Sequence, residues 1–158
     1  MTGGADNDFA AFLIRAKKVT YASQGDDASV TPALMGSRQL EFRDRDLFYR
    51  DVYFGTVFFA GQETVYVKGR AQWTMVYSGG VNDGVDADEI PNIYMFLREA
   101  LRAVSTDMPF RGPCRYSDGE FTYHNNHSGD MGRFHGTERI SRMEHEVYAL
   151  DYSGGFLQ

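Results

Sequence analysis

The sequence is poor in cysteine and proline and has no long apolar stretch. Its 158 residues include one cysteine, Cys114, and four prolines. A single thiol cannot form an internal disulfide or a thiolate zinc site, a pattern typical of a reducing compartment. No apolar run approaches the ~20 residues of a membrane-spanning helix, and the first residues, MTGGADND, lack the basic region of a secretory signal. We therefore expect a cytoplasmic protein that has no membrane segment.

Positive charge is also scarce. The chain has 16 basic and 22 acidic residues, a net charge of -6, whereas a nucleic-acid-binding domain carries a basic surface. We expect no direct contact with nucleic acid. Arginine makes up 13 of the basic residues, which suits the binding of carboxylates and phosphates, although genomic base composition produces the same bias.

Aromatic residues are abundant, with 12 Phe and 10 Tyr, and 42% of the residues are hydrophobic. This apolar content excludes global disorder and predicts a single domain over residues 1–158. Hydrophobic spacing predicts a helix at 9–19 and a second helix that begins near Pro91. Alternating patterns predict strands at 39–43, 47–54, 58–68 and 70–78 and from 120 to the end. Loops are expected at 23–29, 79–88 and 108–113.

The two blocks of predicted strands match each other. A shift of 75 residues aligns Gly61 with Gly136, Glu63 with Glu138, and the YSGG segment at 77–80 with that at 152–155. A helix precedes each block, which predicts an internal repeat with halves at about 9–80 and 90–155. We expect an α+β fold built from a duplicated helix-plus-antiparallel-strands unit, with a curved antiparallel sheet packed on two helices. Chance similarity between aromatic-rich strands is the alternative.

Several short segments carry a resemblance to a known family. They are YRDVYFG at 49–55, GQETV at 61–65, WTMVYSGG at 73–80, MPFRGP at 108–113 and the closing YSGG. Over residues 12–157 the chain resembles a bacterial family of domains of unknown function, DUF5680. Members occur alone or C-terminal in XRE-type helix-turn-helix regulators, so the resemblance implies a sensor-like domain without an assigned activity. This chain has no predicted helix-turn-helix of its own, because strands follow its first helix.

Two glutamates are the candidate catalytic residues. Glu63 and Glu138 are in phase with the apolar side of their strands. An inward carboxylate needs a partner or a raised pKa, and such acids occur at functional sites. Two structural alternatives remain open. Each glutamate accepts hydrogen bonds from neighbouring Tyr, Trp or Arg side chains, or a bulge at the preceding glycine turns it outward.

Other charged and aromatic side chains on these strands are candidate ligand-binding residues. An arginine and tyrosines around a cavity can hold an anionic or planar ligand. The alternatives are a cross-strand ion pair at the sheet edge and aromatic residues that simply fill the core. The candidates are Arg50, Asp51, Tyr53, Trp73, Tyr77, Tyr148 and Tyr152.

No metal or cofactor site is predicted. His124 and His127 are three residues apart, which places them on opposite faces of a strand. Cys114 has no neighbouring base that would make it a nucleophile. Gly79-Gly80 and Gly154-Gly155 are interpreted as turn glycines because no phosphate-loop Lys-Ser/Thr follows them.

Three functions fit these observations. The preferred hypothesis is a small-molecule-binding domain with its pocket between the helices and the inner face of the sheet. The second is a small cofactor-free enzyme, such as a hydrolase, isomerase or cyclase, that uses Glu63 or Glu138 as general acid/base. The third is a protein-interaction module whose edge strands pair with a partner or form a homodimer.

Overall fold

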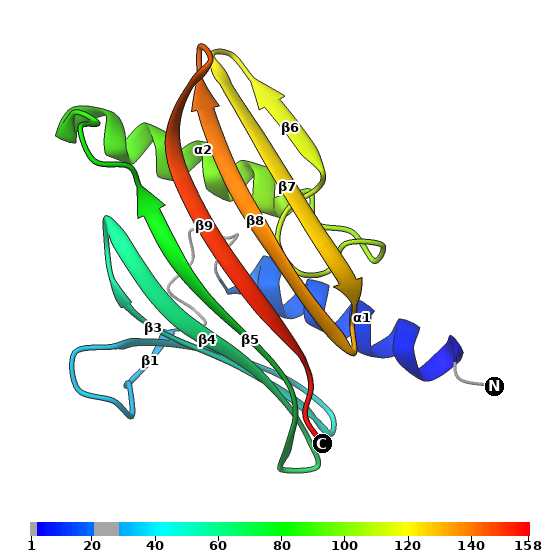
Figure 1. The fold of residues 1–158 in the computed structure, drawn as a ribbon. Helices are drawn as coiled ribbons and strands as arrows, with labels where there is room; N and C mark the ends of the chain where they lie inside the picture. Colours follow the sequence, from blue (N-terminus) through cyan, green and yellow to red (C-terminus); the bar gives the residue numbers. More distant parts are fainter. Residues whose placement is uncertain (1–2, 21–28) are drawn as a thin grey trace.

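The strands of the protein form one continuous antiparallel sheet. The computed structural model describes residues 3–20 and 29–158 (Figure 1). In these residues nine strands pair in the order β1-β2-β3-β4-β5-β9-β8-β7-β6. The loop predicted at 23–29 lies outside the described residues, except that Ser29 begins β1. The strands are β1 Ser29–Val30, β2 Arg38–Asp44, β3 Leu47–Gly55, β4 Phe58–Val67, β5 Arg70–Val81, β6 Arg115–Asp118, β7 Phe121–Asp130, β8 Arg133–Arg142 and β9 His145–Phe156.

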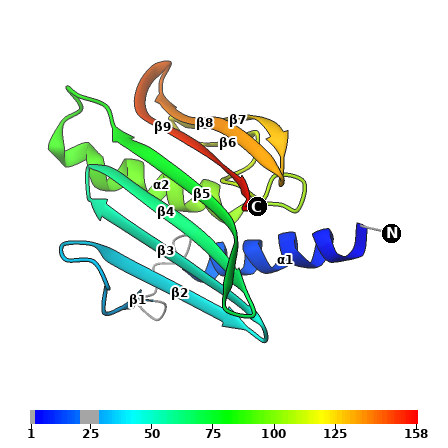
Figure 2. The same cartoon turned by 60° about the horizontal axis from the view of Figure 1, so that its bottom comes forward.

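Two α-helices lie on the same side of the sheet, which curves around them (Figures 1 and 2). They are α1, Gly3–Val19, and α2, Ile90–Arg102, with a short 3-10 helix, Ala87–Glu89, before α2. Pro91 lies in the first turn of α2 as predicted, where its missing N–H costs no helical hydrogen bond. No helix in the described part of the chain is both long and apolar enough to cross a membrane.

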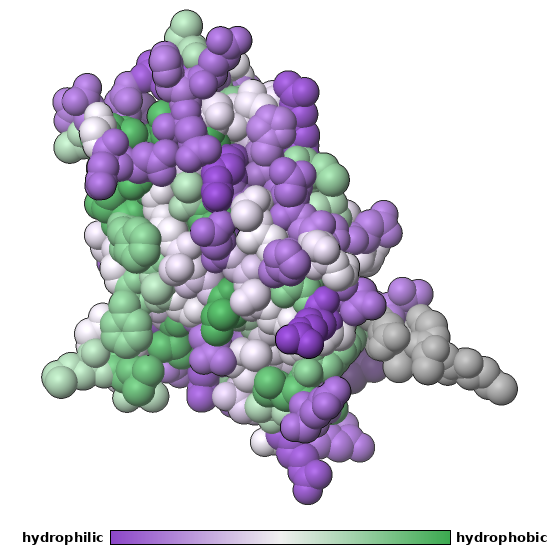
Figure 3. Space-filling model, in the orientation of Figure 1, coloured by the Kyte–Doolittle hydropathy of each residue, from purple (hydrophilic) through white to green (hydrophobic). Residues whose placement is uncertain are grey.

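The inner face of the sheet and the apolar sides of both helices enclose one core. Phe12 and Leu13 of α1 and Ile93 of α2 are fully buried, and they belong to the same cluster as Trp73 and Tyr148 of the sheet. The other face of the sheet is turned away from the helices. Figure 3 shows polar side chains over much of that face, with hydrophobic residues gathered along the side where β3 turns into β4.

The predicted α+β fold, built as a duplicated helix-plus-antiparallel-strands unit, is wrong. Most of the described residues lie in one large nine-stranded antiparallel sheet, and its two α-helices account for a much smaller share. The error arises at Gly79-Gly80 and Gly154-Gly155, which lie inside β5 and β9 instead of in turns. A side chain at Gly79 would place its Cβ 2.7 Å from Leu150 Cβ, so glycine allows β5 and β9 to pair closely. This pairing joins the two blocks of strands. The internal repeat over 9–80 and 90–155 remains a prediction.

Two other glycines provide space for tyrosine rings on the inner face. Gly61 of β4 lies opposite Tyr77 of β5, and Gly136 of β8 lies opposite Tyr152 of β9. A Cβ on Gly61 would lie 2.6 Å from Tyr77 Cζ, well inside van der Waals contact. Each glycine therefore fixes where the neighbouring tyrosine hydroxyl can reach.

We expect Gly61→Ala to lower the free energy of unfolding by about 1–3 kcal/mol, because the added methyl group overpacks a buried tyrosine ring. Gly132→Ala is the matched control. Gly132 lies in an exposed turn, where its new Cβ would meet the exposed carboxylate of Asp130 at 3.1 Å, and we expect a change within about 0.5 kcal/mol. Urea denaturation of both variants measures the difference. Equal stabilities would show that the space above Gly61 is not needed for the tyrosine.

Candidate functional site

Five Lys, Arg, Asp and Glu side chains are buried on the inner side of the sheet. Transfer of such groups out of water is costly unless each one finds a partner. The five come from separate parts of the chain, namely α1, β3, β4, β8 and the loop between α2 and β6. They are Lys17, Asp51, Glu63, Glu138 and Arg111.

Lys17 and Glu63 form a fully buried ion pair. Lys17 lies in the last turn of α1, and its Nζ donates to Glu63 Oε2 and to the Phe110 carbonyl oxygen, both at 2.6 Å. Both side chains have an exposed fraction of 0%. Burial lowers the pKa of Lys17, although the charge of Glu63 acts in the opposite direction. In the described residues the other carboxylate oxygen of Glu63 has no hydrogen-bond partner.

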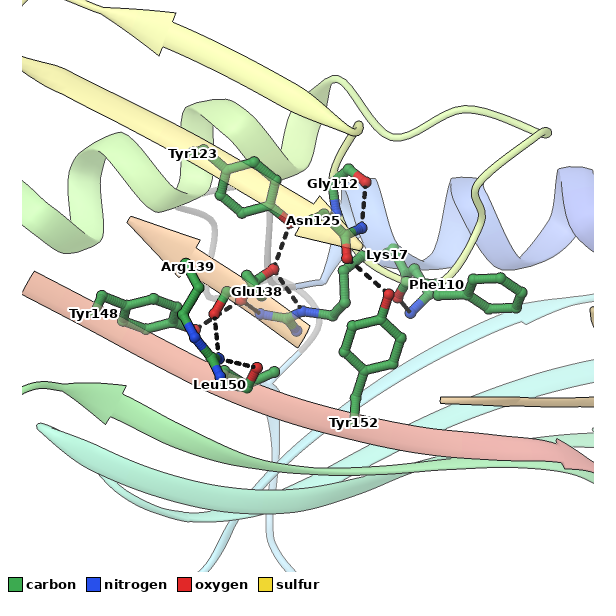
Figure 4. Close-up of polar contacts among 11 residues, drawn as sticks. Lys17, Phe110, Gly112, Tyr123, Asn125, Glu138, Arg139, Tyr148, Leu150 and Tyr152 are labelled. Carbon is green, nitrogen blue, oxygen red and sulfur yellow. Dashed lines mark hydrogen bonds and ion pairs between the residues drawn. The ribbon is translucent and has the colours of Figure 1, made fainter. Parts of the chain in front are cut away.

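Arg111 and Glu138 form the second buried ion pair. Figure 4 shows Glu138 with Tyr123 and Tyr148 beside it. Arg111 donates from Nε at 3.0 Å and from Nη2 at 2.8 Å to the two oxygens of Glu138. The hydroxyls of Tyr123 and Tyr148 donate to the same carboxylate at 2.6 and 2.8 Å. Burial alone raises the pKa of Glu138, but Arg111 and these hydrogen bonds more than offset it and hold the pKa below its usual value. Glu138 is therefore an ionised, fully hydrogen-bonded structural group.

The loop that carries Arg111 is held by its own contacts. The Phe110 ring stacks on Phe134 with 4.0 Å between centroids. The Gly112 N–H donates to the Tyr123 hydroxyl at 2.9 Å, and Asn125 Nδ2 donates to the Gly112 carbonyl at 2.8 Å. The MPFRGP segment, predicted as a connecting loop, thus also delivers a buried cation.

Asp51 is a buried acid whose pKa is raised far above its usual value. It lies directly opposite Glu63 across β3 and β4, and its Oδ1 accepts a hydrogen bond from the Tyr77 hydroxyl at 2.7 Å. Burial, followed by the charge of Glu63, raises the pKa of Asp51 from 3.8 to about 7. Asp51 therefore exchanges its proton near neutral pH.

Asn125 shows what is special about Asp51. It lies opposite Glu138, as Asp51 lies opposite Glu63, and its Oδ1 accepts a hydrogen bond from Tyr152 at 2.7 Å. The geometry is the same, but the amide cannot ionise, and it donates to the Gly112 carbonyl. Of these two matching positions, only Asp51 can gain and lose a proton.

A cavity of about 300 Å³ lies between the inner face of β3–β5 and α2. Asp51, Tyr77 and Arg111 form part of its wall. Aromatic and aliphatic side chains form much of the rest, and further arginines lie around it. The other lining residues are Arg38, Tyr53, Gly55, Thr56, Phe59, Tyr94, Leu97, Arg98 and Leu101.

The structure brings some of the predicted site residues together and separates others. Asp51, Tyr53 and Tyr77 line the cavity. Glu63 and Trp73 are fully buried and are not part of its lining, and Tyr148 and Tyr152 contact the cluster around Glu138 and Asn125. Arg50 lies on the outer face, where it forms a cross-strand ion pair with Glu41 at 3.0 Å, the alternative interpretation of this residue.

Several residues of this region were missed by sequence reasoning. Lys17 follows the apolar positions 13 and 16 of α1 at helical spacing, a signal that was available. Tyr94 and Arg98 lie one turn apart on α2, beside its apolar stripe. Arg111 had no comparable signal, because its position depends on the path of an irregular loop. Among the described residues no three His, Cys, Asp or Glu side chains are grouped as a metal site.

Comparison with known proteins gives one match. Residues 51–157 match the family model described as "Domain of unknown function (DUF5680)". The matched segment includes Asp51, Tyr77, Arg111 and Glu138 but begins after Lys17. No curated protein and no solved structure matches the chain.

We expect Arg111→Met to lower the free energy of unfolding by about 3–5 kcal/mol, because it leaves Glu138 buried without its cation. The double variant Arg111→Met/Glu138→Gln removes the unpaired charge and should recover part of the loss. Arg15→Met is the control, since the Arg15–Asp44 pair is exposed and is expected to contribute less than about 1 kcal/mol. Equal losses for Arg111→Met and Arg15→Met in urea denaturation would contradict this description.

We expect the stability of the parent protein to fall relative to Asp51→Asn as pH rises from about 4 to about 7. Native Asp51 keeps its proton to about pH 7, whereas an unfolded aspartate loses it near 3.8. The native state thus binds more protons in this interval, and its free energy of unfolding decreases with pH. Urea denaturation between pH 4 and 8 measures the difference. Asp46→Asn, in an exposed turn, should follow the parent, and parallel curves for all three proteins would refute the shift.

Proposed function

The chain belongs to the DUF5680 family of domains of unknown function, and we propose that it binds a small molecule in the cavity between β3–β5 and α2. The observation that carries this proposal is a buried, titratable carboxyl, Asp51, in the wall of a cavity lined by aromatic side chains. Perturbed acids in concave, mostly apolar sites are typical of binding and catalytic sites.

The cavity has the composition of a small-molecule site. Its volume of about 300 Å³ is at the lower end of the range for ligand pockets. Tyr53, Phe59 and Tyr94 offer flat apolar surface, and Leu97 and Leu101 add aliphatic surface from α2. A few polar groups, Asp51 and the arginines, supply direction and specificity. A compact, partly planar ligand fits this lining.

The surroundings of the cavity favour a preformed site. Tyr77 is held by its hydrogen bond to Asp51, and Arg111 by its two bonds to Glu138. Tyr94 donates to the Val57 carbonyl at 2.5 Å, which ties α2 to the turn between β3 and β4. Walls that are already ordered lose little entropy when a ligand binds.

The resemblance given above supports a sensor role. It implies a bacterial domain that occurs alone or C-terminal in XRE-type regulators, and the scarcity of cysteine favours a cytoplasmic location. In that setting a bound metabolite is the signal, and the partner of this chain is the small molecule and not nucleic acid. We propose no metal or other cofactor for this activity.

A second candidate is a small cofactor-free enzyme, favoured by the pKa of about 7 of Asp51 and its hydrogen bond from Tyr77. A general acid/base works best when its pKa lies near the working pH. Asp51 is better placed for this role than Glu63 or Glu138, because neither glutamate lines the cavity. Turnover of a bound compound distinguishes the enzyme from the sensor.

We expect at least one compound of a metabolite library to raise the melting temperature of the parent protein by several degrees. A ligand at 100 times its Kd adds about 2.7 kcal/mol to the stability of the folded state. Thr56→Trp, at an exposed position of the cavity lining, should abolish the shift by filling the space. Thr106→Trp, exposed and outside the lining, is the matched control and should keep it. Absence of any hit, or equal shifts for parent and Thr56→Trp, would refute the pocket.

A further inference from the structure

Positively charged side chains outnumber negatively charged ones in the cavity lining. Three arginines line it, Arg38 at the start of β2, Arg98 on α2 and Arg111 in the loop after α2. In the part of the chain that the structure describes, Asp51 is the sole acidic residue of the lining. Glu138 already accepts two hydrogen bonds from Arg111. Arg38 and Arg98 form no ion pair with any described residue, so their charges are available to a ligand.

The groups around Asp51 determine whether its carboxyl is protonated or ionised when a ligand occupies the cavity. Its neighbour Glu63 holds the Nζ of Lys17 at 2.6 Å, whereas Asp51 accepts a hydrogen bond from the neutral Tyr77 hydroxyl. Charged or titratable groups face Asp51 from each element packed around it. They are Lys17 of α1, Glu63 of β4, Tyr77 of β5, Arg111 of the loop and, across the cavity, Arg38 of β2 and Tyr94 and Arg98 of α2.

An anion in this cavity therefore meets two opposite influences. The arginines attract it, and an ionised Asp51 in the wall repels it at short range in a poorly solvated space. Protonation of Asp51 removes the repulsion and leaves an O–H group that can donate to the ligand. Asn125, the matching amide opposite Glu138, shows that this position of the fold accepts an uncharged side chain.

We propose that the ligand is a small organic anion with a flat apolar body, and that it binds together with a proton held on Asp51. This inference rests on the proposed function, since it names the ligand class for the same cavity. The flat body lies against Tyr53, Phe59 and Tyr94, and the anionic group is held by Arg38 and Arg98. The site then acts as a proton-coupled anion receptor, which binds its ligand more tightly as pH falls.

The test uses three probes with the same ring system, 2-naphthoate, 2-naphthamide and 2-naphthylmethylamine, measured by isothermal titration calorimetry. We expect naphthoate to bind at millimolar or lower concentration, as suits a fragment of this size. The amide and the amine should bind at least about tenfold more weakly. Arg98→Gln should weaken the binding of naphthoate but not that of naphthamide.

The proton is tested by the pH profile. With a pKa of about 7 for Asp51, the Kd of naphthoate for the parent should rise about 30-fold between pH 6 and 8.5. Asp51→Asn should show a flat profile and bind more tightly than the parent at high pH, which a purely structural role would not produce. Asp46→Asn is the control and should keep the parent profile. Titrations in two buffers of different ionisation enthalpy should show proton uptake by the parent and none by Asp51→Asn.

The outcomes separate this inference from the proposed function. Tighter binding of naphthamide or the amine, or no binding of any probe, overturns the anion class, while library hits that Thr56→Trp blocks would keep the pocket. A Kd for naphthoate that does not change with pH overturns only the role of the proton and leaves the anion class standing. If no compound of the metabolite library raises the melting temperature of the parent protein, the proposed function itself is refuted.

Discussion

The sheet carries two carboxylates, Glu63 and Glu138, into its interior. The need to pair each of these buried charges with a cation is the constraint on which the rest of the structure depends. Neither finds its cation within the sheet. Lys17 comes from α1 and Arg111 from the loop after α2. An unpaired buried charge costs several kcal/mol, which is comparable with the whole stability of a domain. The helix and the loop are therefore held at fixed positions on the inner face. Arg111 in turn forms part of the cavity wall, so the same ion pair that stabilises the fold also shapes the candidate site.

The tyrosines near the two buried glutamates form different hydrogen bonds in the two halves of the sheet. Around Glu138, the hydroxyls of Tyr123 and Tyr148 complete the hydrogen bonding of the carboxylate. Around Glu63, the neighbouring acid Asp51 takes up the hydrogen bond of Tyr77 instead. One cluster is thus a saturated, structural arrangement, and the other retains a group whose charge can change. A cavity borders the second cluster, which is where a binding or catalytic function benefits from an adjustable charge.

Local hydrophobic patterns in the sequence correctly predicted which side chains of individual strands and helices are buried. Alternation along 58–67 places Glu63 inside with Val65, and the stripe from Ile93 to Leu101 defines the buried side of α2. The overall architecture was not predictable in the same way. The pairing of β5 with β9 joins residues that are 67 to 83 positions apart, and the glycines in those strands resemble turn residues. The site was predicted in part. Asp51 and Tyr77 follow from strand periodicity, whereas Arg111 depends on a loop whose path no periodicity encodes.

The pairing of β5 with β9 also has a consequence for the order in which the molecule is assembled. β9 is the last of the nine strands in the chain, yet it lies in the middle of the sheet, between β5 and β8. During synthesis, strands β1 to β5 are complete long before their central neighbour exists, and β5 presents an open edge through that interval. Contacts between residues so far apart in sequence form slowly. The β5 edge of the first half of the sheet therefore stays without its central partner until β9 has been synthesised.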